Sequence, residues 1–216
     1  MMNAATDRTR PYRSQLRERQ AAETRHRVSE AALALFSQQG YPATTFPQIA
    51  QQAGVSVETA QKHGPKAALL RHAVELAAFG VEGESDLFAT DVGKALLATQ
   101  GVAEFAAVIG QVIHGINAPS AGLWMTVVGA AQGDEELRAF QTEMLASVRV
   151  QIEQVLHMAD QRGWMRGDVP FDDLVEAVCV LTSVDTYVRF VQLDGKSVGA
   201  YQSFVARALR YTGLTS

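Results

Sequence analysis

The chain has 216 residues, of which 47% are hydrophobic and 7% aromatic, and its formal net charge is −4. This is enough apolar material for one or two packed domains, and the abundance of alanine favours helices over sheets. No stretch approaches the roughly 18 uninterrupted apolar residues of a membrane-spanning helix, and no apolar segment follows the N-terminal arginines as it would in a secretory signal. Cys179 is the single cysteine, so no disulfide can form within the chain, which fits a cytoplasmic protein.

The charge is unevenly distributed along the sequence. Residues 1–72 contain ten basic and five acidic side chains, a balance of +5, whereas the rest of the chain has a balance of −9. A basic N-terminal third on an acidic remainder indicates a localised contact with a polyanion. A solvated, arginine-rich helix face gives the same pattern, and charge alone does not separate the two interpretations.

The first elements in chain order are an arm and a helix. Residues 1–12 are polar and contain Pro11, which predicts a disordered arm. A helix is predicted from about Ser14 to Gly40, where glycine is a natural stop. Its apolar residues recur at helical spacing: Val28, Ala31, Ala32, Leu35 and Phe36.

Two short helices separated by a glycine turn are predicted next. Thr45 with Gln48 three residues later forms a capping-box pattern, and Gly54 ends that helix. Ser56 then begins a second helix through His63, which a Gly-Pro pair breaks. This spacing is typical of a helix-turn-helix, whose second helix enters the major groove of DNA, although an ordinary helical hairpin has the same spacing.

The remainder of the sequence predicts further helices and no strand. We expect loops around a short helix over residues 80–101 and helices over 66–79, 102–117, 120–132, 135–162, 172–192 and 197–211. The predicted fold class is therefore all-α. Cys179 is expected to be a small buried hydrophobic side chain.

Residues 25–70 resemble the TetR family of bacterial transcriptional regulators. The segment reads RHRVSEAALALFSQQGYPATTFPQIAQQAGVSVETAQKHGPKAALL. It matches the family pattern at Arg25, Ala31–Ala32, Leu33–Phe36, Gly40–Tyr41, Thr44–Thr45, Ile49–Ala50 and Ala53–Ser56. The motif covers about a fifth of the chain and is more specific than a generic helix-turn-helix.

The resemblance implies a division of the chain. Residues 1–22 would form a basic arm and the start of the first helix, 23–68 the helix-turn-helix domain, and 69–216 a helical effector-binding and dimerisation domain. It further implies a homodimer that binds a palindromic double-stranded DNA operator as a repressor and is released by a small apolar or aromatic ligand. No cofactor, no metal and no membrane partner are implied.

The resemblance also suggests site residues. The expected DNA contacts are Thr44, Thr45, Ser56, Val57, Thr59, Gln61, Lys62, His63 and Lys66, although Thr45 could serve only as a helix cap. The expected effector pocket contains Phe88, Phe105, Ile109, Gln111, His114, Trp124, Met125 and Phe140, although core packing is an alternative for each. The expected dimer interface contains Leu174, Val178, Leu181, Val188, Tyr201, Phe204, Val205 and Leu209.

The second predicted short helix departs from the family pattern. Gln61 stands where the family has a phosphate-contacting Tyr, and the family's packing Phe is missing, with one residue deleted before Gly64. We expect His63 or Phe46 to fill part of that gap. A rival hypothesis follows, in which a TetR-like dimer has weakened or lost operator binding and serves as a ligand- or partner-binding protein.

An enzyme is not indicated. The five histidines show no metal-ligand spacing, and the sequence has no nucleophile elbow, P-loop or dinucleotide fingerprint.

Overall fold

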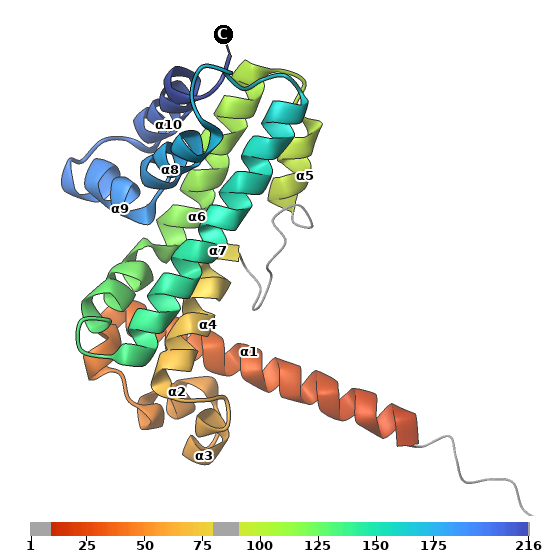
Figure 1. Ribbon diagram of the computed structural model, residues 1–216. Helices are drawn as coiled ribbons and strands as arrows, with labels where there is room; N and C mark the ends of the chain where they lie inside the picture. Colours follow the sequence, from red (N-terminus) through yellow and green to blue (C-terminus); the bar gives the residue numbers. More distant parts are fainter. Residues whose placement is uncertain (1–9, 80–90, 216) are drawn as a thin grey trace, which may run out of the picture. The chain divides into compact units, whose positions relative to one another are not determined.

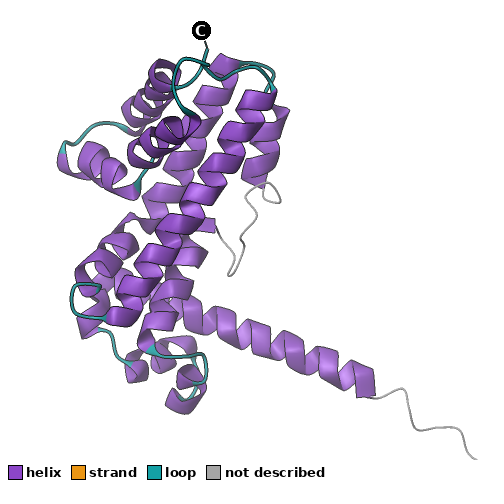
Figure 2. Cartoon of the chain, in the orientation of Figure 1, coloured by secondary structure: helices purple, strands orange, loops and turns teal. Residues whose placement is uncertain are grey.

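The computed structural model describes residues 10–79 and 91–215, and within them the ordered elements are helices without a strand (Figures 1 and 2). The predicted all-α fold is therefore confirmed. The chain divides into two compact units, Met1–Ala73 and Val74–Ser216. Most of the predicted N-terminal arm, residues 1–9, and the segment 80–90 lie outside the described residues. In the described ranges, no helix is long and apolar enough to cross a membrane.

Unit 1 contains α1 (Arg10–Ala43), α2 (Phe46–Ala53), α3 (Val57–Gln61) and the first half of α4 (Lys66–Phe79). The first helix begins earlier than predicted, but its regular part ends where expected, because Gly40 has the left-handed φ of 78°. The buried side chains of this unit come from all four helices: Val28, Ala32, Phe36, Ile49, Ala50, Ala60, Leu69 and Leu70. This core fixes α2 and α3 against the second half of α1.

Unit 2 is built around two long helices, α6 and α7 (Figure 1). Its elements are α5 (Asp91–Ala98), α6 (Val102–Ala130), α7 (Glu135–Gln161), α8 (Phe171–Leu181), α9 (Val184–Tyr187), the π-helical segment η2 (Val188–Leu193) and α10 (Val198–Thr212). The C-terminal helix α10 lies against α6, and Met165 and Leu214 pair in an isolated bridge. Phe105, Leu156, Tyr201 and Val205 are among the buried residues between these helices.

The prediction of separate helices over 102–117 and 120–132 is wrong, because α6 runs through Pro119 without a break. Proline in a helix interior removes one backbone hydrogen bond and is normally costly. Here buried residues on both sides of it, including Asn117, Ala121 and Trp124, hold the two halves in one helix. Tertiary burial therefore outweighs the local preference of proline.

The prediction of one helix over 172–192 is also wrong, because the structure has a break between the end of α8 and the start of α9. The Thr182 hydroxyl donates to the carbonyl of Val178 at 2.7 Å, and the Ser183 hydroxyl accepts from the backbone N–H of Thr186 at 3.1 Å. The second bond is an N-cap, which starts a new helix in a new direction. Asn117 of α6 donates to the carbonyl of Thr182 at 2.9 Å, for which no backbone hydrogen bond is present among the described residues. It also lies 3.4 Å from the carbonyl of Ser183, which accepts the backbone N–H of Tyr187 in α9.

Candidate functional site

The turn between α2 and α3 has the geometry that the sequence predicts. Gln48 Oε1 accepts from both the backbone N–H and the hydroxyl of Thr45, each at 2.8 Å, at the start of α2. Gly54 ends α2 in a left-handed conformation (φ 67°, ψ 38°), which costs glycine little and other residues more. Ser56 then caps α3 by accepting from the backbone N–H of Thr59 at 3.1 Å. The capping box, the glycine and the N-cap all lie within residues 45–59, so the local sequence determines the two helices and the turn between them.

The expected DNA contacts differ in their accessibility. Thr45, Ser56, Val57, Gln61 and Lys62 are exposed, and Thr59, His63 and Lys66 are half-buried. Thr44 is only 1% exposed, and its hydroxyl donates to the carbonyl of Gly40 at 2.8 Å. Its side chain therefore belongs to the interior of unit 1 and offers no surface to a nucleic acid.

Lys66 binds backbone carbonyls of its own chain, a role that the sequence analysis did not predict. Its ammonium group donates to the carbonyls of Tyr41 at 2.7 Å and Thr44 at 3.1 Å, and it lies 4.2 Å from the centre of the Tyr41 ring. Both carbonyls belong to the segment between α1 and α2. The charge of Lys66 is thus used to hold that segment against the start of α4.

His63 or Phe46 is expected to fill part of the space left by the aromatic residue that α3 lacks. His63 and Phe46 are both half-buried, so neither lies in solvent, as expected for residues that fill part of this gap. Gln61, at the position of the family's Tyr, is exposed. It offers an amide at the surface but no aromatic packing.

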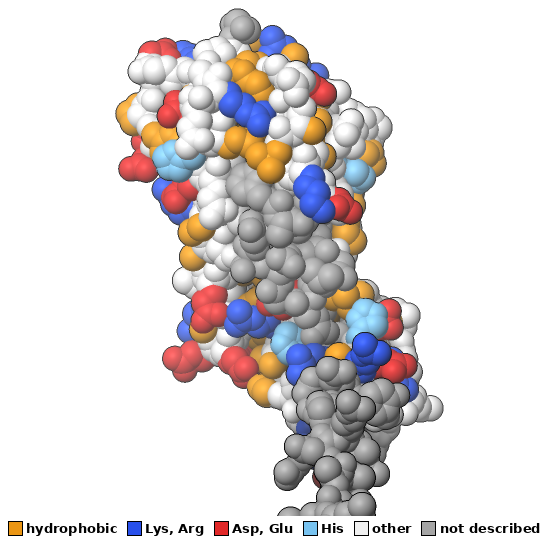
Figure 3. Space-filling model, turned by 90° about the vertical axis from the view of Figure 1, so that its right-hand side faces the viewer, with side chains coloured by type: hydrophobic (Ala, Val, Ile, Leu, Met, Phe, Trp, Pro, Cys, Tyr) orange, Lys and Arg blue, Asp and Glu red, His pale blue; other side chains and the backbone are white. Residues whose placement is uncertain are grey.

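Charges of both signs lie around α3. Lys62 Nζ is 3.0 Å from a carboxylate oxygen of Glu58, one turn earlier on the same exposed face. On the face shown in Figure 3, the Lys, Arg and His side chains of the described residues lie among Asp and Glu.

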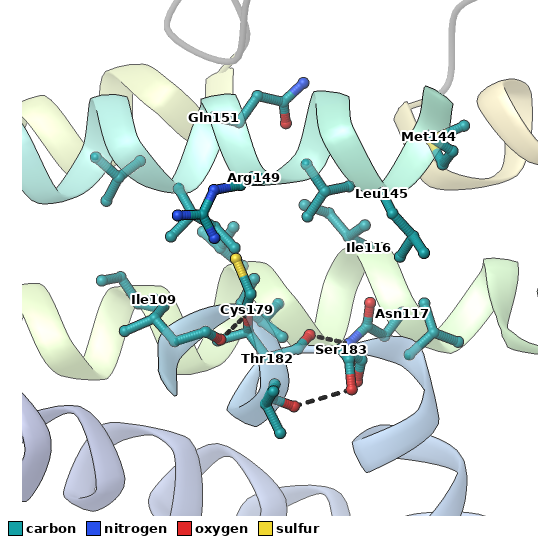
Figure 4. Close-up of a pocket in the computed structure, with 18 of the residues that line it drawn as sticks. Ile109, Ile116, Asn117, Met144, Leu145, Arg149, Gln151, Cys179, Thr182 and Ser183 are labelled. Carbon is teal, nitrogen blue, oxygen red and sulfur yellow. Dashed lines mark hydrogen bonds between the residues drawn. The ribbon is translucent and has the colours of Figure 1, made fainter. Parts of the chain in front are cut away.

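Unit 2 contains a cavity of about 600 Å³ between α6, α7 and α8, with a predominantly apolar lining (Figure 4). Its size is within the range of small-molecule sites, which are usually apolar with a few polar groups. Ile109, Val112, Ile116, Ile152 and Val155 supply much of its wall. Its polar and charged lining comes from Asn117, Ser120, Arg149, Gln151, Glu176, Thr182, Ser183 and Asp185.

Of the expected effector residues, Ile109 and Trp124 line this cavity. Phe88 lies outside the described residues. The other five do not line the cavity: Phe105, Gln111, His114, Met125 and Phe140. The reason is helical phase, because Phe105 packs inward against Trp164, His114 lies beside Tyr187, and Gln111 and Met125 are on the exposed side of α6.

Sequence reasoning missed the polar residues of the cavity. Asn117 and Ser120 flank Pro119, where we expected a loop, and Thr182 and Ser183 lie at a break that was not foreseen. Cys179 is half-buried and lines the cavity rather than lying in the core, and burial raises the pKa of its thiol. The one signal in the sequence was Asn117, a polar residue two positions before Pro119.

The expected dimer residues lie mainly in the core of a single subunit. Leu174, Val178, Val188, Tyr201, Val205 and Leu209 are all buried within unit 2. Leu181 and Phe204 are half-buried. On the same helices the exposed apolar side chains are instead Val180, Leu193, Val198 and Tyr211. Apolar periodicity does not distinguish a face that packs inside the subunit from one that meets a partner.

No metal centre is formed by the part of the chain that the structure describes, where no three His, Cys, Asp or Glu side chains are grouped closely enough to hold an ion.

Comparisons with known proteins agree with this geometry. Residues 29–73 match the family described as bacterial regulatory proteins, tetR family. Among solved structures, the chain is similar to a TetR-family transcriptional regulator from Rhodococcus sp., with a TM-score of 0.70, 15% identity and coverage of 88% of this chain and 98% of that one. No curated protein sequence matches the chain.

Two further similar structures contain small molecules. One is a transcriptional regulator from Saccharomonospora viridis in complex with choline, with a TM-score of 0.67, 20% identity and coverage of 90% of this chain and 100% of that one. The other is the SmeT–triclosan complex, with a TM-score of 0.68, 14% identity and coverage of 89% and 92%. At these identities the likeness concerns the fold.

Proposed function

We propose that this protein is a TetR-family transcriptional regulator, a repressor that binds a palindromic operator as a homodimer and is released by a small apolar ligand. The observation that carries the proposal is the helix-turn-helix of unit 1, in which α3 presents exposed side chains beside a glycine turn. The match of residues 29–73 to the tetR family supports a regulator rather than an enzyme.

The proposed DNA contacts are the exposed and half-buried residues of the turn and of α3. Val57 would contact thymine methyl groups, and Gln61 would donate to a phosphate or pair with the edge of an adenine. Lys62 and Thr45 would bind phosphate oxygens, with Ser56, Thr59 and His63 beside them. Thr44 and Lys66 are left out of this set, because one is buried and the other binds two backbone carbonyls.

The proposed ligand site is the cavity of unit 2. Its volume and apolar lining suit a small molecule, and two proteins of the same fold are known with choline and with triclosan. A ligand there would touch α6, α7 and α8 together. Binding that favoured one arrangement of these helices would shift the population of DNA-binding conformations.

The proposed dimer uses the last helices of unit 2. Half-buried Leu181 and Phe204, with exposed Leu193, Val198 and Tyr211, are apolar side chains that a partner could still cover. An isologous interface suits a palindromic operator, because protein and DNA then share a two-fold axis.

Selection from a random double-stranded DNA library tests the proposal directly. We expect enrichment of an inverted repeat and, with that sequence, an affinity that falls steeply with salt, by roughly 0.9 in log K per log unit of salt for each phosphate neutralised. Failure to enrich any sequence, or an affinity that does not respond to salt, would contradict operator binding.

The rival function, a TetR-like dimer without operator binding, is favoured by one observation. Gln61 is exposed where the family has a phosphate-contacting Tyr, and the family's packing Phe is missing, so α3 lacks both aromatic side chains. Replacement of Gln61 by Tyr, with Phe inserted before Gly64, should then create affinity for a candidate operator that the natural protein lacks. Equal binding by the two proteins would remove the reason for this rival.

A further inference from the structure

The hydroxyl groups of the cavity have already used their hydrogens. The Ser120 hydroxyl donates to a backbone carbonyl at 2.7 Å, Thr182 does so at 2.7 Å, and Ser183 at 2.9 Å. A hydroxyl has one hydrogen and two lone pairs. Each of these side chains can therefore accept a hydrogen bond from a ligand but has no further hydrogen to donate.

Asn117 presents an acceptor to the cavity for the same reason. Its Nδ2 donates to the carbonyls of Thr182 and Ser183 and to the hydroxyl of Tyr201 at 3.3 Å. Because a carbonyl can only accept, these contacts fix which end of the amide is nitrogen. The oxygen is left without a partner among the described residues, although Asn117 is only 3% exposed, and Figure 4 shows it directed towards α7.

The charge of the lining is negative. Arg149 is its cation, against the carboxylates of Glu176 and Asp185, which gives a formal balance of −1. The guanidinium of Arg149 lies 2.7 Å from Glu176 and 3.1 Å from Glu153, so two carboxylates already compensate its charge. An anionic ligand would have to displace one of them and would meet Asp185 as well.

The remaining lining donors do not change this balance. The indole N–H of Trp124 has no hydrogen-bond partner among the described residues, but the nitrogen is buried and has almost no accessible surface. The amide of Gln151 is directed away from α6 in Figure 4. The thiol of Cys179 is a weak donor.

We propose that this cavity selects apolar amines in their ammonium form and discriminates against carboxylates. The apolar body of the ligand lies between α6 and α7. Its N–H groups donate to Asn117 and to the carboxylates of Glu176 and Asp185. This inference rests on the proposed function, in that the cavity is taken as the effector site. It adds the chemical class of the effector, which an apolar cavity does not specify.

The test uses four probes with one apolar body and different heads: naphthalen-1-ylmethylamine, its trimethylammonium analogue, naphthalene-1-methanol and naphthalene-1-acetate. Affinities for the full-length protein are measured by isothermal titration calorimetry. We expect the amine to bind at least tenfold more tightly than the acetate, with the alcohol between them. Binding of the trimethylammonium analogue more weakly than the amine would show that the N–H donors contribute beyond charge.

Two variants identify the groups involved. Glu176→Gln removes a carboxylate and releases Arg149, so it should weaken the amine and strengthen the acetate. Asp185→Asn should weaken the amine alone. Asp173→Asn is the matched control, because Asp173 is exposed on α8 but does not line the cavity, and it should change neither affinity.

Each other outcome overturns part of the argument. Acetate binding as tightly as the amine would overturn the inference while leaving a ligand-responsive regulator intact. A complete lack of binding by all four probes would overturn the inference together with the ligand half of the proposed function. Operator binding is measured separately by the library selection and is unaffected by either result.

Discussion

Two lysines four positions apart have different surroundings, and only one is available to DNA. Lys62 is exposed and paired with Glu58 on the surface of α3, whereas Lys66 is half-buried and bound to two carbonyls. A surface ion pair contributes little to stability, so Lys62 can leave Glu58 for a phosphate at small cost. Position along the sequence alone gave both the same expected role.

Lys62 and Glu58 should therefore have opposite effects on the affinity of the protein for DNA. Lys62→Gln should weaken operator binding and reduce the salt slope by about one per subunit, and Glu58→Gln should strengthen binding by removing a charge that repels phosphate. Filter binding or fluorescence anisotropy at several salt concentrations measures both. Thermal unfolding serves as the control, since neither change should alter stability appreciably; a Lys62 variant with an unchanged slope would exclude it as a phosphate contact.

The pH dependence of the alkylation rate of Cys179 tests the environment of its thiol in the cavity. Burial raises the pKa of its thiol, with Glu176 and Glu153 adding to the effect and Arg149 opposing it. Since the thiolate is the reacting form, alkylation by iodoacetamide should accelerate only at a higher pH than in the urea-unfolded chain. Arg149→Met should move the profile still higher, and a bound amine should slow the reaction. A folded protein that reacts along the same profile as the unfolded chain would contradict this environment.

At the scale of whole elements, α6 and α10 approach each other so closely that one glycine is required. A Cβ on Gly110 would lie 2.6 Å from the backbone carbonyl oxygen of Gln202. Gly115, on the same helix, has nothing within 4 Å of the equivalent position.

These two glycines form a matched pair for mutation. Gly110→Ala should destabilise unit 2 by about 1–3 kcal/mol, because it forces two helices apart. Gly115→Ala should instead stabilise α6 by roughly 0.5–1 kcal/mol, the usual gain on replacing glycine in a helix. Urea unfolding followed by circular dichroism measures both, and a Gly110→Ala protein of natural stability would show that the helices can separate freely.

The sequence predicts helices well where local signals act alone and less well where distant residues decide. Caps at Thr45 and Ser56 and the glycine at 54 determine α2 and α3 from within their own segments. Separate helices are predicted over 102–117 and 120–132, but α6 continues through Pro119 because buried residues on both sides of it hold the helix together. The break after Thr182 depends in part on Asn117, 65 positions earlier, which no local pattern reveals.

The two candidate sites differ in the same way in how far the sequence predicts them. The surface of α3 could be anticipated, because its members are consecutive in the chain. The cavity wall could not, because its residues come from every helix from α4 to α10. In addition, an error of one position on α6 turns a side chain by about 100°. This is why Trp124 lines the cavity and Met125 does not.

At the scale of the whole molecule, the exposed apolar residues of the last helices should decide association. A double change, Leu193→Glu with Tyr211→Glu, introduces charge at side chains that are 73% and 77% exposed. If they lie in a dimer interface, sedimentation should show a shift from dimer to monomer and a parallel loss of operator affinity. Val150→Glu is the control, since Val150 is exposed on α7, outside these helices. A double variant that remains dimeric would place the interface elsewhere.

The contacts of Lys66 have a mechanical consequence. They join the first turn of α4 to the chain that leads directly into α2, through two hydrogen bonds and the Tyr41 ring. The same helix continues past Ala73, so it begins in unit 1 and ends in unit 2. A rotation of α4 that kept these contacts would turn α2 and α3 with it, so the direction in which α3 faces would follow the axis of α4.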